Sequence, residues 1–212
     1  MSNQIVVFGA ESAMAHEAVE TCRRLGIEIA AAVVTGRPEW ELLELDNIVH
    51  ENAISDSLTK LPVICPVWLP QLRRRAVESA RKLGFNDFMT IVDPTATVAS
   101  SARLGKGVYV HTGANVGAGA TIGDFALINR GALVSHHCHL RAYVTTGPGI
   151  TMSSRCRIGE EAVLGVGCTL IQDRIVGERA FVGAGAVVIR DVDADTTVAG
   201  NPARVIKRSK DS

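Results

Sequence analysis

The sequence predicts an α/β region with a small parallel sheet over residues 1–90, then a parallel β-helix over residues 91–192 and a tail or cap over residues 193–212. Three observations predict this order. Short apolar runs alternate with amphipathic segments in the first ninety residues. An aliphatic residue then recurs every six positions from Val92 to Val188. The chain has 20 glycines but only 4% aromatic residues, which favours close approach of backbones over large interlocking side chains.

Composition limits the function classes. Apolar residues make up 47% of the 212 residues, which is enough for a packed core and excludes wholesale disorder. Lys plus Arg is 22 and Asp plus Glu is 22, so no overall basic field exists and we expect no nucleic-acid partner. No apolar run reaches the roughly 18 residues that span a membrane. The start of the chain lacks the basic flank of a signal peptide. We therefore expect a cytoplasmic protein with reduced cysteines.

The first ninety residues show a β-α-β-α pattern, which indicates a small parallel sheet. Ser12 is a candidate cap for the first helix, and Gly26 and Gly84 follow the two helices. The three consecutive arginines of the second helix, 73–75, are interpreted as a solvated face. The pattern leaves residues 39–60 unassigned. The expected elements are strands at 5–8, 27–34 and 62–65 and helices at 14–25 and 69–83.

The second part of the chain is a six-residue repeat. Of the 17 positions reached by stepping from Val92 to Val188, 16 are apolar, and the exception is Thr146. The position four residues further on is nine times Ala and three times Cys, and the position directly after the aliphatic residue is eight times Gly. A period of six fits neither a helix nor a simple strand, but it fits short strands joined by tight corners. Three such strands make a coil of 18 residues, and coils stack at about 4.8 Å.

This pattern assigns a place to each residue type. The aliphatic side chain points inward, the small residue fills the corner, and the glycine after the aliphatic residue permits the turn conformation. Arg174 occupies a small-residue position, which predicts a local bulge. Residues 135–139 lack the glycine and contain three histidines, and a regular repeat interrupted by polar residues is where function is expected.

The whole chain resembles the two-domain, hexapeptide-repeat sugar acetyltransferases. These include sialic acid O-acetyltransferases and the N-acetyltransferases of nucleotide-linked 4-amino sugars such as bacillosamine and perosamine. The resemblance implies a left-handed β-helix that holds acetyl-CoA, a Rossmann-like N-terminal domain that holds the acceptor, and a homotrimer. Four stretches carry the resemblance: 8–10, 91–96, 128–138 (Ile-Asn, then Val-Ser-His-His-Cys) and 199–207.

The resemblance assigns the general base to His136. A neutral imidazole can accept the proton of an attacking amine or hydroxyl group, because its ordinary pKa lies near the working pH. The acceptor then reacts directly with bound acetyl-CoA. Family members usually place an acidic residue beside this histidine. Here the neighbours are Ser135 and His137, which are the candidates for catalytic support.

The resemblance also assigns substrate contacts. Asn129 matches an asparagine near the acceptor, and Thr145 falls where the family has a second histidine near acetyl-CoA. The ends of the first two strands are further acceptor candidates, although a plain strand-to-helix turn is an equal alternative at the first. The phosphates of CoA are assigned to two basic residues for which a solvated tail is an equal alternative. The acceptor set is Asn129, Gly9, Ala10, Glu11 and Arg37, and the acetyl-CoA set is Thr145, Gly147, Gly165, Val166, Gly183, Ala184, Arg204 and Lys207.

Other functions remain open beside this one. The run from His136 to His139 suggests a metal site, but alternate side chains of an extended segment point to opposite sides, so we expect no metal. The sequence therefore predicts an acetyl-CoA-dependent acetyltransferase acting on an amino or hydroxyl group of a sugar, most simply a nucleotide-linked amino sugar. The alternatives are a non-catalytic β-helix scaffold or binding module, and an acetyltransferase of an amino acid or small amine.

Overall fold

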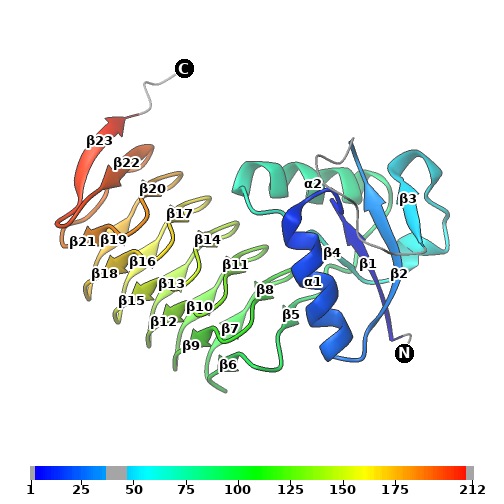
Figure 1. Cartoon of the computed structure of the whole chain (residues 1–212), viewed down its shortest axis with the longest axis horizontal. Helices are drawn as coiled ribbons and strands as arrows, with labels where there is room; N and C mark the ends of the chain where they lie inside the picture. The colour runs from blue at the N-terminus through cyan, green and yellow to red at the C-terminus, as the bar shows by residue number, and fades with distance from the viewer. Residues whose placement is uncertain (1–2, 37–46, 209–212) are drawn as a thin grey trace.

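The computed structural model describes residues 3–36 and 47–208. Its N-terminal half is a four-stranded parallel sheet in the order β3-β2-β1-β4, with two α-helices and two short 3-10 helices (Figure 1). The strands are β1 (Gln4–Phe8), β2 (Glu28–Val34), β3 (Ile48–His50) and β4 (Val63–Ile64). The helices are α1 (Ala13–Arg24), α2 (Pro70–Lys82), η1 (Glu51–Ala53) and η2 (Leu58–Lys60).

These elements confirm the predicted strands and helices. The Ser12 side chain caps α1 by accepting a hydrogen bond from the backbone N of Met14 at 3.3 Å. Gly84 follows α2 with a φ of 102°, a conformation that glycine adopts without strain. The sequence pattern missed β3, because this strand is only three residues long and has no fully buried side chain.

The second half is a β-helix of two-residue strands that form three parallel sheets. Each strand pairs in register with the strand 18 residues later, as Thr121 does with His139. The predicted coil is confirmed. The first sheet contains β5 (Ile91–Val92), β8 (Tyr109–Val110), β11 (Leu127–Ile128), β14 (Thr145–Thr146), β17 (Val163–Leu164) and β20 (Phe181–Val182). The second contains β6 (Thr97–Val98), β9 (Asn115–Val116), β12 (Leu133–Val134), β15 (Thr151–Met152), β18 (Thr169–Leu170) and β21 (Val187–Val188). The third contains β7 (Arg103–Leu104), β10 (Thr121–Ile122), β13 (His139–Leu140), β16 (Arg157–Ile158) and β19 (Ile175–Val176).

The β-helix core is built as the repeat predicts. The aliphatic and small positions between Val108 and Val188 form one buried cluster, and Cys138, Cys156 and Cys168 take the small position in it as free thiols. Arg174 corrects one expectation. The pairing of β16 with β19 keeps its register there, so no bulge forms. The Arg174 side chain instead turns outward and pairs with Asp191 at 3.2 Å.

The repeat contains two kinds of glycine. The glycine directly after the aliphatic residue was expected to permit the turn conformation, and this expectation is wrong. The glycine after the aliphatic residue does not have a positive φ. A Cβ on Gly123 would lie 2.6 Å from the backbone N of Ala142 in the next coil, so this glycine is required for coil stacking. The turn conformation falls two residues later, as at Gly131 with a φ of 62°. Non-glycine residues such as His137 also occupy that turn position.

Helix α2 joins the two halves through Arg73, whose side chain is buried. Its guanidinium donates to the carbonyl oxygens of Phe125 and Tyr143, each at 2.7 Å, and to Thr145 Oγ1 at 2.9 Å. The interpretation of arginines 73–75 as a solvated face is therefore wrong for Arg73. Burial lowers the pKa of Arg73 to about 9, which leaves it charged at neutral pH.

Helix α1 joins the first coils through Asp93, which is buried at the start of the β-helix. Asp93 accepts hydrogen bonds from Arg24 Nε and Thr21 Oγ1, both at 3.0 Å, and from the backbone N of Thr95 at 2.9 Å. Burial opposes the charge of Asp93, but these donors outweigh it and hold the pKa of Asp93 well below its usual range.

The chain ends in an antiparallel hairpin of β22 (Thr196–Ala199) and β23 (Arg204–Arg208), which extends the first sheet. The hairpin and the N-terminal half lie at opposite ends of the β-helix (Figure 1). Neither α-helix of the described residues is long and apolar enough to cross a bilayer.

Candidate functional site

The triangular coil has three corners, and the predicted base and the predicted acetyl-CoA glycines lie at different corners. We call the turns that follow strands of the first, second and third sheets the first, second and third corners. In the fourth row of turns these are residues 147–150, 153–156 and 159–162. The predicted base lies at the second corner, whereas the glycines predicted to meet acetyl-CoA lie at the first. One strand of the second sheet separates these two corners within each coil.

His136 follows β12 and is exposed at the second corner. Its Nδ1 lies 3.0 Å from Nδ1 of His137, and the two ring planes cross at 86°. Ser135 is half-buried, and Cys138 is buried and donates to the carbonyl oxygen of Ser153 at 3.2 Å. Among the described residues, no carboxylate forms a hydrogen bond with either imidazole. Among the described residues, no carboxylate therefore takes the place of the family's acidic partner at the second corner.

Asn129 lies at the first corner and is only 3% exposed. Its Oδ1 accepts a hydrogen bond from the backbone N of Arg130 at 2.7 Å, and its backbone N donates to Thr146 Oγ1 at 2.9 Å. This second contact explains why Thr146 is the one non-aliphatic residue of the repeat. Its buried hydroxyl supports the turn that carries Asn129.

The glycines predicted to contact acetyl-CoA stack in one column at the first corner, and a second row of glycines, here called the ridge, lies beside this column. Gly147 and Gly165 are buried, and Val166 and Ala184 are exposed beside them, with Gly183 half-buried. Two residues after the buried column, every described turn of the first corner from residue 113 to 185 has a glycine with positive φ. The Cβ position has no atom within 4 Å at four of these five glycines, and at Gly113 it would lie 4.0 Å from the backbone N of Gly131. This ridge is Gly113, Gly131, Gly149, Gly167 and Gly185. Sequence reasoning missed it, although its spacing of 18 residues was the available signal.

Thr145 lies elsewhere. It is fully buried where α2 meets the first sheet, and its Oγ1 accepts from Arg73 Nη2 and donates to the carbonyl oxygen of Trp68, both at 2.9 Å. These two contacts occupy the hydroxyl, so we leave Thr145 out of the ligand site proposed below. Arg204 and Lys207 are exposed on β23, at the end of the β-helix remote from the N-terminal half.

The acceptor candidates border a hollow of about 780 Å³ in the N-terminal half. It lies at the carboxyl ends of β1 and β2, the usual ligand position of open parallel sheets. Gly9 and Glu11 line it, and Ala10 is buried behind them. Glu11 accepts a hydrogen bond from the backbone N of Thr35 at 3.2 Å. Arg37 lies outside the described residues. The other lining residues include Ser12, Glu51, Trp68, Leu72, Arg75 and Ser79.

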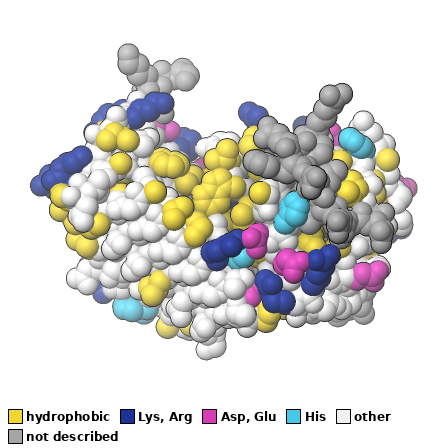
Figure 2. Space-filling model, viewed as in Figure 1, with side chains coloured by type: hydrophobic (Ala, Val, Ile, Leu, Met, Phe, Trp, Pro, Cys, Tyr) yellow, Lys and Arg dark blue, Asp and Glu magenta, His cyan; other side chains and the backbone are white. Residues whose placement is uncertain are grey.

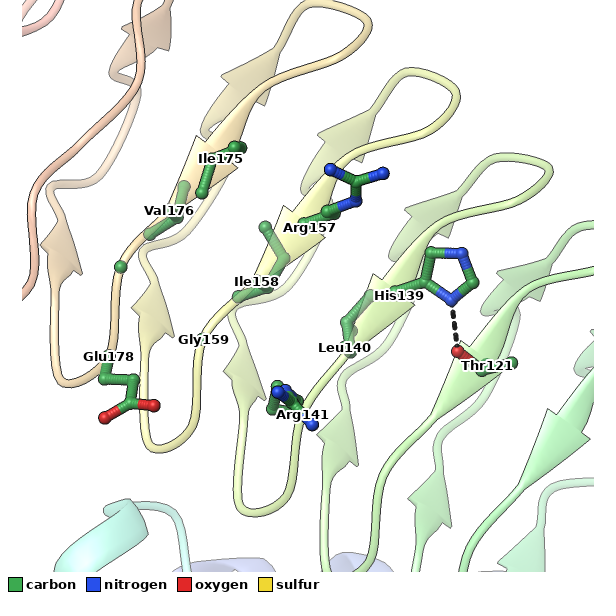
Figure 3. Close-up of a pocket in the computed structure, with 11 residues that line it drawn as sticks. Thr121, His139, Leu140, Arg141, Arg157, Ile158, Gly159, Ile175, Val176 and Glu178 are labelled. Carbon is green, nitrogen blue, oxygen red and sulfur yellow. Dashed lines mark hydrogen bonds between the residues drawn. The ribbon is translucent and has the colours of Figure 1, made fainter.

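A second, smaller hollow of about 510 Å³ lies on the outer face of the third sheet (Figure 3). His139, Arg157 and Ile175 follow one another along successive strands there, and His139 Nδ1 lies 2.6 Å from Thr121 Oγ1. None of the predicted site residues lines this hollow. It is therefore separate from the candidate site.

The described surface shows no metal centre: residues 3–36 and 47–208 contain no group of three or more His, Cys, Asp or Glu side chains placed to hold an ion. Hydrophobic side chains gather over the β-helix on the face shown in Figure 2, and oppositely charged side chains lie together nearer the N-terminal half. Large exposed apolar residues of the β-helix are Leu133, Val166, Ile171, Ile175, Phe181 and Ile189.

Solved structures match this architecture over nearly the whole chain. Perosamine N-acetyltransferase from Caulobacter crescentus, crystallised with CoA and GDP-perosamine, is 31% identical, with 96% of this chain and 96% of that chain covered and a TM-score of 0.85. The chain belongs to the hexapeptide-repeat sugar acetyltransferases. It is therefore an acyltransferase, and the alternative of a non-catalytic scaffold is set aside.

Two further structures agree. The acetyltransferase domain of PglB from Neisseria gonorrhoeae, in complex with acetyl coenzyme A, is 30% identical over 97% of this chain and 100% of that chain, with a TM-score of 0.86. WeeI from Acinetobacter baumannii shares the fold at 24% identity, 95% and 99% coverage and a TM-score of 0.74. The shared fold is the left-handed β-helix with an N-terminal α/β region. No family model matches the chain, and no curated protein matches it.

Proposed function

We propose that this enzyme transfers the acetyl group of acetyl-CoA to the amino group of a nucleotide-linked 4-amino sugar. One observation carries the proposal: the 31% identity to an enzyme crystallised with CoA and GDP-perosamine extends over 96% of both chains. The similarity thus includes the half with the hollow at β1 and β2 and the half with the corners of the β-helix.

His136 acts as the general base in this proposal. The amine attacks the thioester carbon, a C–N bond forms, and Nε2 of His136 takes the proton of the amine. The C–S bond then breaks and the CoA thiolate leaves, to be protonated in turn. His136 is suited to this step because it is exposed and because a neutral imidazole accepts a proton near neutral pH.

The donor is proposed to lie along the glycine ridge of the first corner, beside Val166 and Ala184. Acetyl-CoA supplies the thioester, and the ridge supplies an exposed backbone without side chains. The glycines of the buried column, Gly147 and Gly165, are explained by coil stacking, because a Cβ on either would lie 2.6 Å from a backbone atom of the following coil. Arg204 and Lys207 remain candidates for the CoA phosphates.

We propose a homotrimer, and the separation of the corners supports it. His136 and the glycine ridge lie on different corners of one chain, so in this proposal the base and the donor of one site come from two copies. A second copy whose second corner faces the first corner of its neighbour would complete the site, and closed three-fold symmetry repeats this contact three times. The exposed apolar residues of the β-helix are consistent with such an interface.

The nucleotide of the acceptor is proposed to occupy the hollow at β1 and β2, whose volume is typical of a small-molecule site. Glu11, Ser12 and Arg75 supply polar groups around it. Asn129 is proposed to act through its backbone turn and amide at the first corner, close to where the sugar must meet the donor.

The test is an assay of acetyl transfer from acetyl-CoA to guanosine- and uridine-diphosphate 4-amino sugars, followed by product mass and by release of free CoA thiol. We expect turnover with at least one nucleotide-linked amino sugar and none with free amino acids. His136→Ala should lower kcat by about 100-fold or more. His139→Asn, an exposed histidine three residues away, is the matched control and should keep the activity. Acetylation of amino acids alone would contradict the proposal.

A further inference from the structure

We propose that His137 is a positioning residue, which accepts a hydrogen bond from Nδ1–H of His136 and so leaves Nε2 of His136 free to take the substrate proton. The inference rests on the proposed function, in which His136 is the base. The two Nδ1 atoms are 3.0 Å apart. A hydrogen bond between them requires one nitrogen to donate and the other to accept, which couples the tautomers of the two rings.

The backbone fixes the position of the His137 ring. His137 has a φ of 56°, in the region where glycine and asparagine are favoured, and Gly119 occupies the same turn one coil earlier. Its backbone N donates to the carbonyl oxygen of Ala118 at 2.9 Å. The ring lies against Gly119, since a Cβ there would be 3.1 Å from His137 Nε2.

Other side chains in this strained turn position have visible contacts that explain them. Phe125 and Tyr143 stack on one another with centroids 5.1 Å apart, and Arg155 pairs with Asp173. For His137, the side-chain hydrogen bond that the structure shows is the one to His136. The contact with His136 is therefore the side-chain interaction that accompanies the strained backbone of His137, and such strain is common at functional sites.

The charged groups around the two rings do not supply another partner. One coil later, Arg155 lies at the position of His137, and its Nε and Nη2 donate to Asp173 at 2.7 and 2.8 Å. Ser154 lies at the position of His136 in that coil, and Ala118 in the preceding coil. His139, next along the chain, contacts Thr121. His137 is therefore the acceptor available to His136 among the described residues.

This arrangement predicts an effect on the chemical step. When Nε2 of His136 takes the proton, the ring becomes an imidazolium and its Nδ1–H···Nδ1 bond becomes charge-assisted, hence stronger. A bond that strengthens in the transition state changes kcat, not the KM of either substrate. A carboxylate in place of His137 would favour the imidazolium further.

Three variants test the inference in the assay described above. His137→Gly restores the residue used at this turn one coil earlier, so the fold is kept, and kcat should fall about fivefold or more with both KM values unchanged. His137→Asn keeps an acceptor and suits the positive φ, so it should recover most of kcat. His137→Glu should move the acid limb of the kcat–pH profile to higher pH, because the carboxylate holds the proton on His136.

Each result decides between the two proposals. Equal kcat for wild type and His137→Gly, or an unmoved acid limb in His137→Glu, overturns the positioning role and leaves His136 as the base. Full activity of His136→Ala overturns the base and the positioning role together. Lower kcat in His137→Gly, recovery in His137→Asn and a displaced limb in His137→Glu support the inference, since a purely structural role would not move the pH profile.

Discussion

Arg73 Nε donates a hydrogen bond of 2.7 Å to the carbonyl oxygen of Phe125, a residue 52 positions later in the chain. Through this bond and its neighbours at Tyr143 and Thr145, one buried cation ties α2 to two successive coils. Arg73 also donates to the carbonyl oxygen of Trp68, which lines the proposed acceptor hollow. Arg73 therefore helps to fix the position of that hollow relative to the β-helix.

Replacing Arg73 should destabilise the protein. Arg73→Met keeps the aliphatic stem but leaves buried carbonyl oxygens without donors, and we expect a loss of about 3 kcal/mol in the free energy of unfolding. Chemical denaturation followed by circular dichroism measures it. Arg75→Met, two residues away and exposed, should change stability by less than about 0.5 kcal/mol. Equal stability of the two variants would show that the carbonyl oxygens find other donors.

Asp93 should make stability depend on acid pH. Its folded-state pKa is lowered, so its charge stabilises the fold above the ordinary aspartate pKa of about 3.9, and this contribution is lost as pH falls below that value. Asp93→Asn should lose about 2 kcal/mol at pH 7. The gap to wild type should narrow in denaturation curves recorded below about pH 4. A gap that stays constant with pH would mean that the carboxylate charge is not what stabilises this joint.

Replacement by alanine should destabilise the protein more at a glycine required for coil stacking than at a glycine of the turn. A Cβ on Gly123 would lie 2.6 Å from the backbone of Arg141 and Ala142, so Gly123→Ala should cost about 3 kcal/mol. Gly131 has open space at its Cβ position but a φ of 62°, so Gly131→Ala should cost only about 1 kcal/mol. Thermal melting of both variants checks the order, and the reverse order would refute the stacking role.

A site shared between copies can be tested by mixing two inactive variants. His136→Ala removes the base, and Val166→Trp blocks the ridge on the first corner. If each site takes its base from one copy and its ridge from another, mixed trimers formed by refolding equal amounts should recover about a quarter of the wild-type activity. A mixture that remains inactive, with trimers present by light scattering, would place both residues' functions within one chain.

The fold was largely predictable because the coil requires the same residue types at every sixth position of the sequence. The aliphatic positions from Val92 to Val188 face one shared core, so all but Thr146, whose hydroxyl has a buried hydrogen-bond partner, are apolar. Arg73 was not predictable. Its acceptors are mainly backbone carbonyl groups more than fifty residues away, and carbonyl acceptors place no requirement on residue type.

The candidate site was predictable only in part. His136 was located by the interruption of the repeat and by the family resemblance, and its assignment as the base remains a prediction. The contact between His136 and His137 was not predictable, because it depends on a positive φ at residue 137 that the sequence does not indicate. The proposed contact between the first corner of one copy and the second corner of another could not be predicted from the sequence of a single chain.

The apolar core beneath α2 is completed by side chains that are synthesised late. Phe125 and Tyr143 pack in one cluster with Val77 and Phe85, so the core of the N-terminal half is incomplete until the second and third coils exist. During synthesis, the apolar face of α2 therefore lacks part of its packing until about sixty further residues have been added. The architecture changes near residue 90, whereas the apolar core of the N-terminal half extends past it into the β-helix. A truncated chain ending there would expose the hydrophobic surface that chaperones bind.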